Sequence, residues 1–225
     1  MTLANDFLPK IHSAGYWRIN IRPTSFDKKR IASLRECKQI MISSQVSLRG
    51  WSYPHLRDGD IISGQDWVEY GHEWMQYIEY WRFYQSAQFI QHLASREDHA
   101  GLSNAPKQFI SPLSTLYSFT EIFEFASRLA KREILQPEAE ILIKLIGLKD
   151  HILYEPGRPL SFINGHVCRI NEIIIEKTVS DVELIAHKSE LALRATMDTF
   201  ERFNWDNPPE KYFAEQQLKF IERRI

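Results

Sequence analysis

The sequence predicts an α+β fold, in which a largely antiparallel sheet is covered by helices on one side. Three observations lead to this prediction. Strand-like segments with period-two alternation come in groups, helix-like segments with apolar stripes follow them, and a strand-strand-strand-helix unit occurs twice, at about residues 45–132 and 139–204. Such grouping is typical of antiparallel sheets, whereas parallel sheets show strict alternation of strands and helices.

The strands are predicted from side-chain alternation and from the turn signals between them. Trp17, Ile19 and Ile21 share one face of residues 16–22, which is the pattern of a half-buried strand. An Asp-Gly turn at residues 58–59 predicts a hairpin between two extended runs. The predicted strands are residues 16–22, 46–53, 61–70, 80–93, 141–146, 152–154 and 169–177.

The helices are predicted from apolar residues at steps of three and four and from capping residues in their first turns. Ser111-Pro112 begins a broadly apolar helix, and Ser180 with Glu183 forms a capping box before another stripe. Residues 95–107 are polar and rich in turn formers, which predicts a loop or domain junction open to proteolysis. The predicted helices are residues 28–43, 111–132, 180–203 and 212–221.

Length and composition are those of an ordinary globular protein. The chain has 225 residues, of which 44% are hydrophobic and 25% are charged. We expect a single domain over residues 1–225, with two internal halves at about 16–132 and 139–225 as the alternative. Its 28 basic and 29 acidic side chains give a net charge of −1, so any binding of nucleic acid has to be local.

The sequence also bears on where the protein acts. The N-terminus lacks the basic and apolar regions of a signal peptide, and no apolar run approaches the roughly 18 residues that span a bilayer. Cys37 and Cys168 form no CxxC pair, which fits a reducing compartment. We therefore expect a soluble, cytoplasmic protein that does not contact membranes.

Motifs of several well-known catalytic classes are missing from the sequence. It contains no GxGxxG, GxxxxGK[ST], HExxH or GxSxG pattern and no set of kinase motifs, which disfavours those classes. Its eight histidines include no pair at i and i+4, so a helical zinc site is not indicated. No metal ligands are predicted, and the sequence does not identify a cofactor.

One segment concentrates side chains that suit a binding site. Residues 48–55 (LRGWSYPH) place Arg49, Trp51, Tyr53 and His55 around a glycine and a proline. Arginine pairs with phosphate and aromatic planes stack on bases, which favours a ligand-binding surface. The alternative interpretation is that the two aromatic residues are half-buried in the sheet with the arginine stacked on them.

Further candidates lie outside this segment. Arg22 and Arg82 are expected near Arg49, where they would extend the ligand-binding set, although Arg82 also suits the solvent side of a strand. His55 and Glu79 are the candidates for proton transfer, because partial burial or a neighbouring charge brings the pKa of either group toward neutrality.

Two acidic residues of the predicted helix 111–132 form another candidate. Glu121 and Glu124 are three positions apart and share one helix face, which suggests a carboxylate pair. The alternatives are solvated helix charges, or a capping role for Glu121 after Ser118.

Four segments carry a resemblance to a known family. They are WRINIRP (17–23), SQVSLRGWSYPH (44–55), YWRFYQS (80–86) and TEIFEF (120–125). Over most of its length the chain resembles an uncharacterised bacterial protein family that has no defined activity. Similar segments occur beside nucleotide- or nucleic-acid-related modules, so the resemblance implies a regulatory or defence role and transfers no catalytic residue.

Three hypotheses for the function follow. The first is a binding or sensing module that presents residues 49–55 to a nucleotide, a nucleic acid or a partner protein. The second is a small hydrolase of a nucleotide-like substrate that uses His55 and Glu79. The third is a subunit whose aromatic residues form a homo-oligomer interface. The first hypothesis requires the named side chains to converge on an accessible, concave surface.

Overall fold

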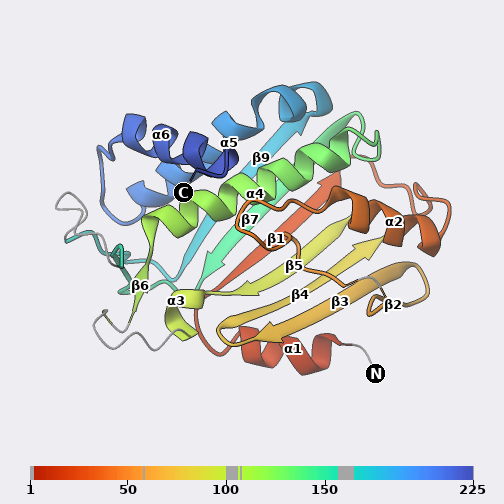
Figure 1. Ribbon diagram of the computed structural model, residues 1–225, viewed down its shortest axis with the longest axis horizontal. Coiled ribbons are helices and arrows are strands. Elements are labelled where there is room, and N and C mark those ends of the chain that lie inside the picture. The colour runs from red at the N-terminus through yellow and green to blue at the C-terminus, as the bar shows by residue number, and fades with distance from the viewer. Residues whose placement is uncertain (1–2, 58, 100–105, 107, 157–164, 225) are drawn as a thin grey trace.

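An antiparallel sheet is the main element of the computed structural model, which describes residues 3–57, 59–99, 106, 108–156 and 165–224 (Figure 1). Across these residues seven strands pair in the order β2-β3-β4-β5-β1-β7-β9, with antiparallel neighbours throughout. Two short strands, β6 and β8, pair in parallel beside it. The strands are β1 (Tyr16–Pro23), β2 (Ile62–Ser63), β3 (Trp67–Trp74), β4 (Tyr77–Tyr84), β5 (Phe89–Ala94), β6 (Phe109–Ile110), β7 (Glu138–Ile146), β8 (Ile152–Leu153) and β9 (Glu172–Ser180).

Strand β1 joins the two parts of the sheet. It pairs with β5 along one edge and with β7 along the other, so that Ile19 lies between Gln91 and Ile143. Trp17, Ile19 and Ile21 are buried, as their alternation predicts, whereas Arg18 and Arg22 on the other face are exposed. The sheet therefore runs through both of the suggested internal halves.

Helices pack over the face of the sheet that carries these apolar side chains (Figure 1). Helix α4 crosses the sheet, and its Phe119 meets Trp17 edge-on with ring centroids 5.1 Å apart. The antiparallel α+β class predicted from the sequence is confirmed. The helices on this side are α2 (Leu34–Ser44), α4 (Pro112–Ala130), α5 (Asp181–Glu201) and α6 (Glu210–Ile221).

Helix α1 (Ala4–Ile11) lies on the opposite face, so the predicted one-sided cover holds for α2, α4, α5 and α6 but not for α1. Ile11 packs there with Ile78 and Tyr80, whose side chains point away from the α4 side. Helix α1 was not predicted, because it spans only eight residues and contains Pro9, so its local signals are weak.

The predicted single strand 80–93 is wrong. These residues belong to a hairpin, in which β4 and β5 pair and residues 85–88 turn the chain. Ala87 has a φ of 65°, a left-handed conformation that residues other than glycine adopt rarely. Residues 85–88 contain no glycine, asparagine or proline, so none of these residues marked the turn in the sequence.

The predicted hairpin between residues 46–53 and 61–70 is also wrong. The first run folds back on itself around Gly50, which has a φ of 88°. Val46 and Tyr53 exchange two backbone hydrogen bonds of 2.7 and 2.6 Å, so the first run pairs with itself, while the second run contributes to β2 and β3. The chain turns inside the run, ahead of the predicted Asp-Gly turn, whose residue 58 lies outside the described residues.

Several boundaries differ from the prediction. Helix α2 begins at Leu34 rather than at residue 28, because Ser33 accepts a hydrogen bond from the Glu36 backbone and caps the helix. The predicted repeat is not reproduced strand for strand, since β8 belongs to the smaller sheet. The predicted loop 95–107 begins with the short helix α3 (Arg96–His99), and most of the remainder lies outside the described residues.

Gly71→Ala tests how α1 is docked. A Cβ atom at Gly71 would lie 2.4 Å from a ring carbon of Phe7, so the substitution forces α1 away from the sheet. We expect the free energy of unfolding, measured by urea denaturation, to fall by about 1–3 kcal/mol. Phe7→Ala in the same chain removes the clashing ring, and the double variant should be no less stable than Phe7→Ala alone. Additive losses would contradict this packing.

Candidate functional site

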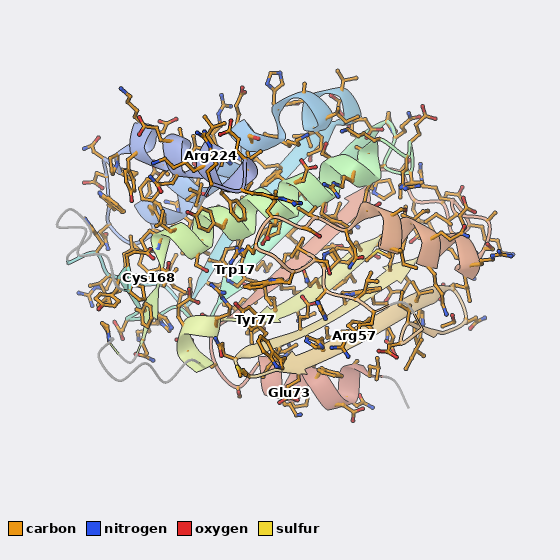
Figure 2. All side chains as sticks on the ribbon, in the orientation of Figure 1. Trp17, Arg57, Glu73, Tyr77, Cys168 and Arg224 are labelled. Atoms are coloured by element: carbon orange, nitrogen blue, oxygen red, sulfur yellow. The ribbon has the colours of Figure 1, made fainter. Side chains whose placement is uncertain are left out.

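A pocket of about 130 Å³ opens on the helix-covered side of the sheet. Its walls are the loop 49–55, the ends of β3, β4 and β5, and the first half of α4. Figure 2 labels two of its side chains, Trp17 on β1 and Tyr77 on β4. We call it the aromatic pocket, and its lining includes Trp17, Arg49, Trp51, Tyr53, His55, His72, Trp74, Tyr77, Glu79, Arg96, Ser114, Ser118 and Glu121.

Aromatic side chains form much of the wall. Trp51 meets Tyr77 edge-on, with ring centroids 5.0 Å apart. On the outer side, Trp74 stacks on the same tyrosine with centroids 6.2 Å apart. Trp17 and Tyr53 are buried, whereas Trp51 is 40% exposed at the mouth. The pocket thus has flat, apolar walls of the kind that hold planar ligands.

A buried carboxyl group lies among these aromatic residues. One oxygen of Glu79, Oε2, accepts a hydrogen bond of 3.0 Å from Gln91, whose own oxygen accepts one of 2.6 Å from the Tyr53 hydroxyl. Burial raises the pKa of Glu79 to about 8, although the nearby His55 backbone and the Gln91 side chain favour the ionised form and oppose the shift. Glu79 is therefore mostly protonated and neutral at pH 7.

The pKa of the His55 imidazole is shifted in the opposite direction to that of Glu79. Burial lowers its pKa, and the nearby His72 and Arg57 lower it further. The rings of His55 and His72 lie 4.1 Å apart between centroids. The His55 carbonyl accepts a hydrogen bond of 2.8 Å from Trp81, which ties this part of the loop to the sheet. The neutral imidazole offers the pocket a proton acceptor.

Arg49 and Glu121 form a buried ion pair across the pocket. Arg49 Nε lies 3.0 Å from Glu121 Oε2, and the side chains are only 11% and 4% exposed. Arg49 Nη2 also donates hydrogen bonds to the Ser118 hydroxyl and the Ser114 carbonyl, at 3.0 and 3.3 Å. The Arg49 guanidinium is therefore held largely by the protein itself.

Apart from Arg49 Nε, which is 3.0 Å from Glu121 Oε2, three polar atoms of the pocket have no hydrogen-bond partner among the described residues: His55 Nε2, Glu79 Oε1 and Glu121 Oε1. Each is buried, and leaving a buried polar atom unpaired costs about 1–3 kcal/mol. Such atoms are rare in folded proteins, and three around one pocket indicate a place that water or a bound molecule completes.

A second, more open hollow of about 630 Å³ adjoins the pocket. It shares Arg49, Trp51 and Arg96 with the aromatic pocket and adds Arg223. Arg223 is exposed and donates a hydrogen bond of 2.6 Å to the Ser47 carbonyl. No acidic residue belongs to the described lining of this hollow, which we call the basic hollow.

The structure brings together five of the predicted site residues. Arg49, Trp51, Tyr53, His55 and Glu79 all line the aromatic pocket. The alternative, in which Trp51 and Tyr53 are half-buried under a stacked Arg49, is wrong in its details. Tyr53 is buried, Trp51 is exposed at the mouth, and the Arg49 guanidinium lies over the rings of Tyr117 and Phe220.

The expectation that Arg22 and Arg82 lie near Arg49 is wrong. Both side chains point to the other face of the sheet, because residues one position apart on a strand alternate between faces. Arg82 pairs with the buried Glu69 at 2.7 Å, and Arg22 pairs with Glu140 at 2.8 Å.

The predicted carboxylate pair of α4 is not formed. Glu124 pairs with Arg128 and Lys188, at 3.0 and 3.2 Å, while Glu121 is buried against Arg49. Glu121 is therefore neither a partner of Glu124 nor a solvated helix charge.

Sequence reasoning missed Arg96, Tyr77, His72 and Trp74 as members of the site. Arg96 donates hydrogen bonds to the Tyr77 hydroxyl and, at 2.8 Å, to the Ser114 hydroxyl. It lies in the segment predicted as a loop, and its partners are far away in the sequence. Trp74 and Tyr77 flank the tight turn between β3 and β4, and aromatic residues beside a turn were the available signal.

The chain matched no protein-family model, no curated protein and no solved structure when it was compared with each. Within the described part of the chain, no three His, Cys, Asp or Glu side chains gather closely enough to hold a metal ion. No helix among those residues is long and apolar enough to cross a membrane. The chemistry of the aromatic pocket is therefore the basis for assigning a function.

Glu79→Gln tests the neutral state of this carboxyl. Burial raises the pKa of Glu79 from 4.5 to about 8, so the folded chain keeps a proton that the unfolded chain releases between these values. The resulting stability is present below the unfolded pKa and is lost as the pH rises through the folded pKa. We expect the free energy of unfolding to fall by a few kcal/mol more in the unsubstituted protein than in Glu79→Gln between about pH 5 and pH 8.

Urea denaturation over this pH range measures the difference. Glu201→Gln, which alters an exposed carboxylate at the end of α5, is the matched control and should follow the unsubstituted protein. Parallel curves for the Glu79→Gln variant and the unsubstituted protein would show that Glu79 is ionised in the folded state.

Proposed function

We propose that this chain is a cytoplasmic nucleotide-binding module. In this proposal a ring of the base enters the aromatic pocket, and the phosphate lies in the basic hollow beside Arg96 and Arg223. The observation that carries the proposal is the continuity of the two spaces, since Arg49, Trp51 and Arg96 line both. A regulatory or defence role, as the family resemblance implies, would suit a module that binds and reports a nucleotide.

The size and walls of the aromatic pocket support a base-like ligand. An apolar cavity of about 150 Å³ accommodates benzene, so a volume of about 130 Å³ suits a group of one ring. Trp51 and Tyr77 offer aromatic surfaces against it. Base–aromatic stacking contributes about 1–3 kcal/mol per base and is available to every base.

The polar groups of the pocket support a ligand with both donors and acceptors. A protonated Glu79 can donate one hydrogen bond and accept others, while His55 Nε2 can accept one as a neutral imidazole. The edges of nucleobases carry donors and acceptors side by side. The ion pair with Arg49 leaves Glu121 Oε1 without a partner, which adds an acceptor.

The basic hollow supports a phosphate group outside the pocket. Arginine recognises phosphate through paired hydrogen bonds. Arg49 is held by Glu121 and the α4 serines, so the proposal assigns phosphate contact to Arg96 and Arg223 instead. This differs from the sequence-based expectation, in which Arg49 paired with the phosphate.

Calorimetric titration with nucleosides and their monophosphates tests the proposal. We expect at least one of AMP, GMP, CMP and UMP to bind, and to bind more tightly than its nucleoside, because Arg223 contacts the phosphate. Arg223→Ala should remove most of that difference. Arg224→Ala is the matched control, because this neighbouring arginine pairs with Glu222 and does not line the hollow.

Trp51→Ala should weaken nucleoside and monophosphate alike by about tenfold, as the loss of one stacking surface predicts. Phe26→Ala, which removes an exposed aromatic side chain away from the pocket, should change neither affinity. The absence of binding by every nucleotide to the folded protein would refute the proposed function.

A hydrolase of a nucleotide-like substrate is the second candidate, and the opposite pKa shifts of Glu79 and His55 favour it. A carboxyl that is protonated at neutral pH can serve as a general acid, and a neutral imidazole can serve as a general base. Both groups line one pocket.

Product analysis after incubation with the four monophosphates tests this second candidate. A hydrolase should release inorganic phosphate or free base, and Glu79→Gln and His55→Asn should each lower the rate by at least about a hundredfold. Binding without turnover would favour the binding module. Turnover that survives both substitutions would exclude these residues as the acid and the base.

A further inference from the structure

The turn between β3 and β4 exposes large apolar side chains beside the aromatic pocket. Trp74 is 57% exposed and Met75, next to it, is 73% exposed. Exposed apolar side chains that cluster at the mouth of a pocket mark a binding surface more often than isolated ones do. The proposed function uses the pocket and leaves this surface without a role.

The aromatic residues at the mouth form a continuous series, which we call the aromatic ladder: Trp51, Tyr77 and Trp74. Tyr77 is in the middle, with Trp51 edge-on at 5.0 Å and Trp74 stacked at 6.2 Å and an interplanar angle of 18°. Trp74 stacks on Tyr77, and more than half of the Trp74 side chain remains exposed. A second planar group therefore has room to stack on the Trp74 indole.

The position of Tyr77 is fixed from behind. Arg96 donates a hydrogen bond to the Tyr77 hydroxyl, and its guanidinium lies 5.0 Å from the centre of the ring. Arg96 is itself held by the Ser114 hydroxyl of α4 at 2.8 Å. The ladder therefore has a defined geometry and is connected to the pocket wall, which lowers the entropy lost when a ligand stacks on it.

Positive charge lies near the ladder as well. Arg57 is close enough to His55 and His72 to lower the pKa of both imidazoles. His72 lies two residues before Trp74 on β3, so the two side chains share one face of the strand. Aromatic platforms with arginine beside them are the usual elements of sites that bind single-stranded nucleic acid.

We propose that the ligand is longer than one nucleotide: a dinucleotide, or the end of a single-stranded nucleic acid, whose terminal base enters the aromatic pocket while the next base stacks on Trp74. This inference rests on the proposed function and names its substrate class. Arg96, which contacts Tyr77 and lines the basic hollow, then lies beside the phosphate that links the two nucleotides.

Titration with dinucleotides tests this inference separately from the proposed function. The probes are AMP, GMP, CMP and UMP and the matching dinucleotides ApA, GpG, CpC and UpU. We expect the dinucleotide of the preferred base to bind about tenfold more tightly than its mononucleotide, as one additional stacked base predicts. Trp74→Ala should reduce this ratio to near one, and Trp74→Phe, which keeps an aromatic plane, should restore most of it.

Three other outcomes of these titrations would overturn this inference, and one of them would overturn the proposed function as well. Equal affinity for a dinucleotide and its mononucleotide would overturn this inference and leave the proposed function intact. A dinucleotide preference that survives Trp74→Ala would also overturn it, because the second base would then stack elsewhere. No binding by any probe would overturn the proposed function and this inference together. Circular dichroism of each variant confirms that the fold is kept.

Discussion

The pairing of β1 with strands on both sides is the constraint on which the rest of the structure depends. β5 comes from the chain before α4 and β7 from the chain after it, and β1 connects them within the sheet. Its buried face also supplies Trp17, which supports Phe119 of α4 and forms part of the aromatic pocket. The same strand thus holds the sheet together, positions the long helix and contributes one wall of the site.

The loop over the sheet converts this framework into a site, and it does so at a cost in stability. The backbone pair between Val46 and Tyr53 closes the loop, and the Trp81 indole holds the His55 carbonyl. The closed loop and the neighbouring strands leave Glu79 buried with one oxygen unpaired. A core optimised for stability alone would replace such a carboxyl with an apolar side chain, so its presence is more simply explained by function than by folding.

Local patterns predicted the parts of the fold that depend on local interactions. The alternation around Trp17 predicted β1, and the capping box at Ser180 predicted the start of α5, whose first turn it closes. The turn at Ala87 was missed because its conformation is imposed by the surrounding sheet and not by the residue type.

For the site, composition identified the segment 48–55, but the ion pair of Arg49 with Glu121 joins residues far apart in the sequence. Period-two alternation was sufficient to separate Arg82 from that segment, because Arg82 and Trp81 are adjacent on β4 and point to opposite faces of the sheet. Long-range partners such as these have no local signature in one sequence.

The balance between binding and hydrolysis depends on what the pocket can hold besides the ligand. At neutral pH a protonated Glu79 and a neutral His55 carry no net charge, which suits an uncharged ring in an apolar space. Hydrolysis needs an attacking water within reach of a base as well as the substrate. A volume of about 130 Å³ suits a single ring, so a ring that fills the aromatic pocket displaces the water that its lining would otherwise hold. The dimensions of the aromatic pocket therefore agree better with the proposed binding module than with a hydrolase, and in that proposal the same two groups serve as hydrogen-bond donor and acceptor.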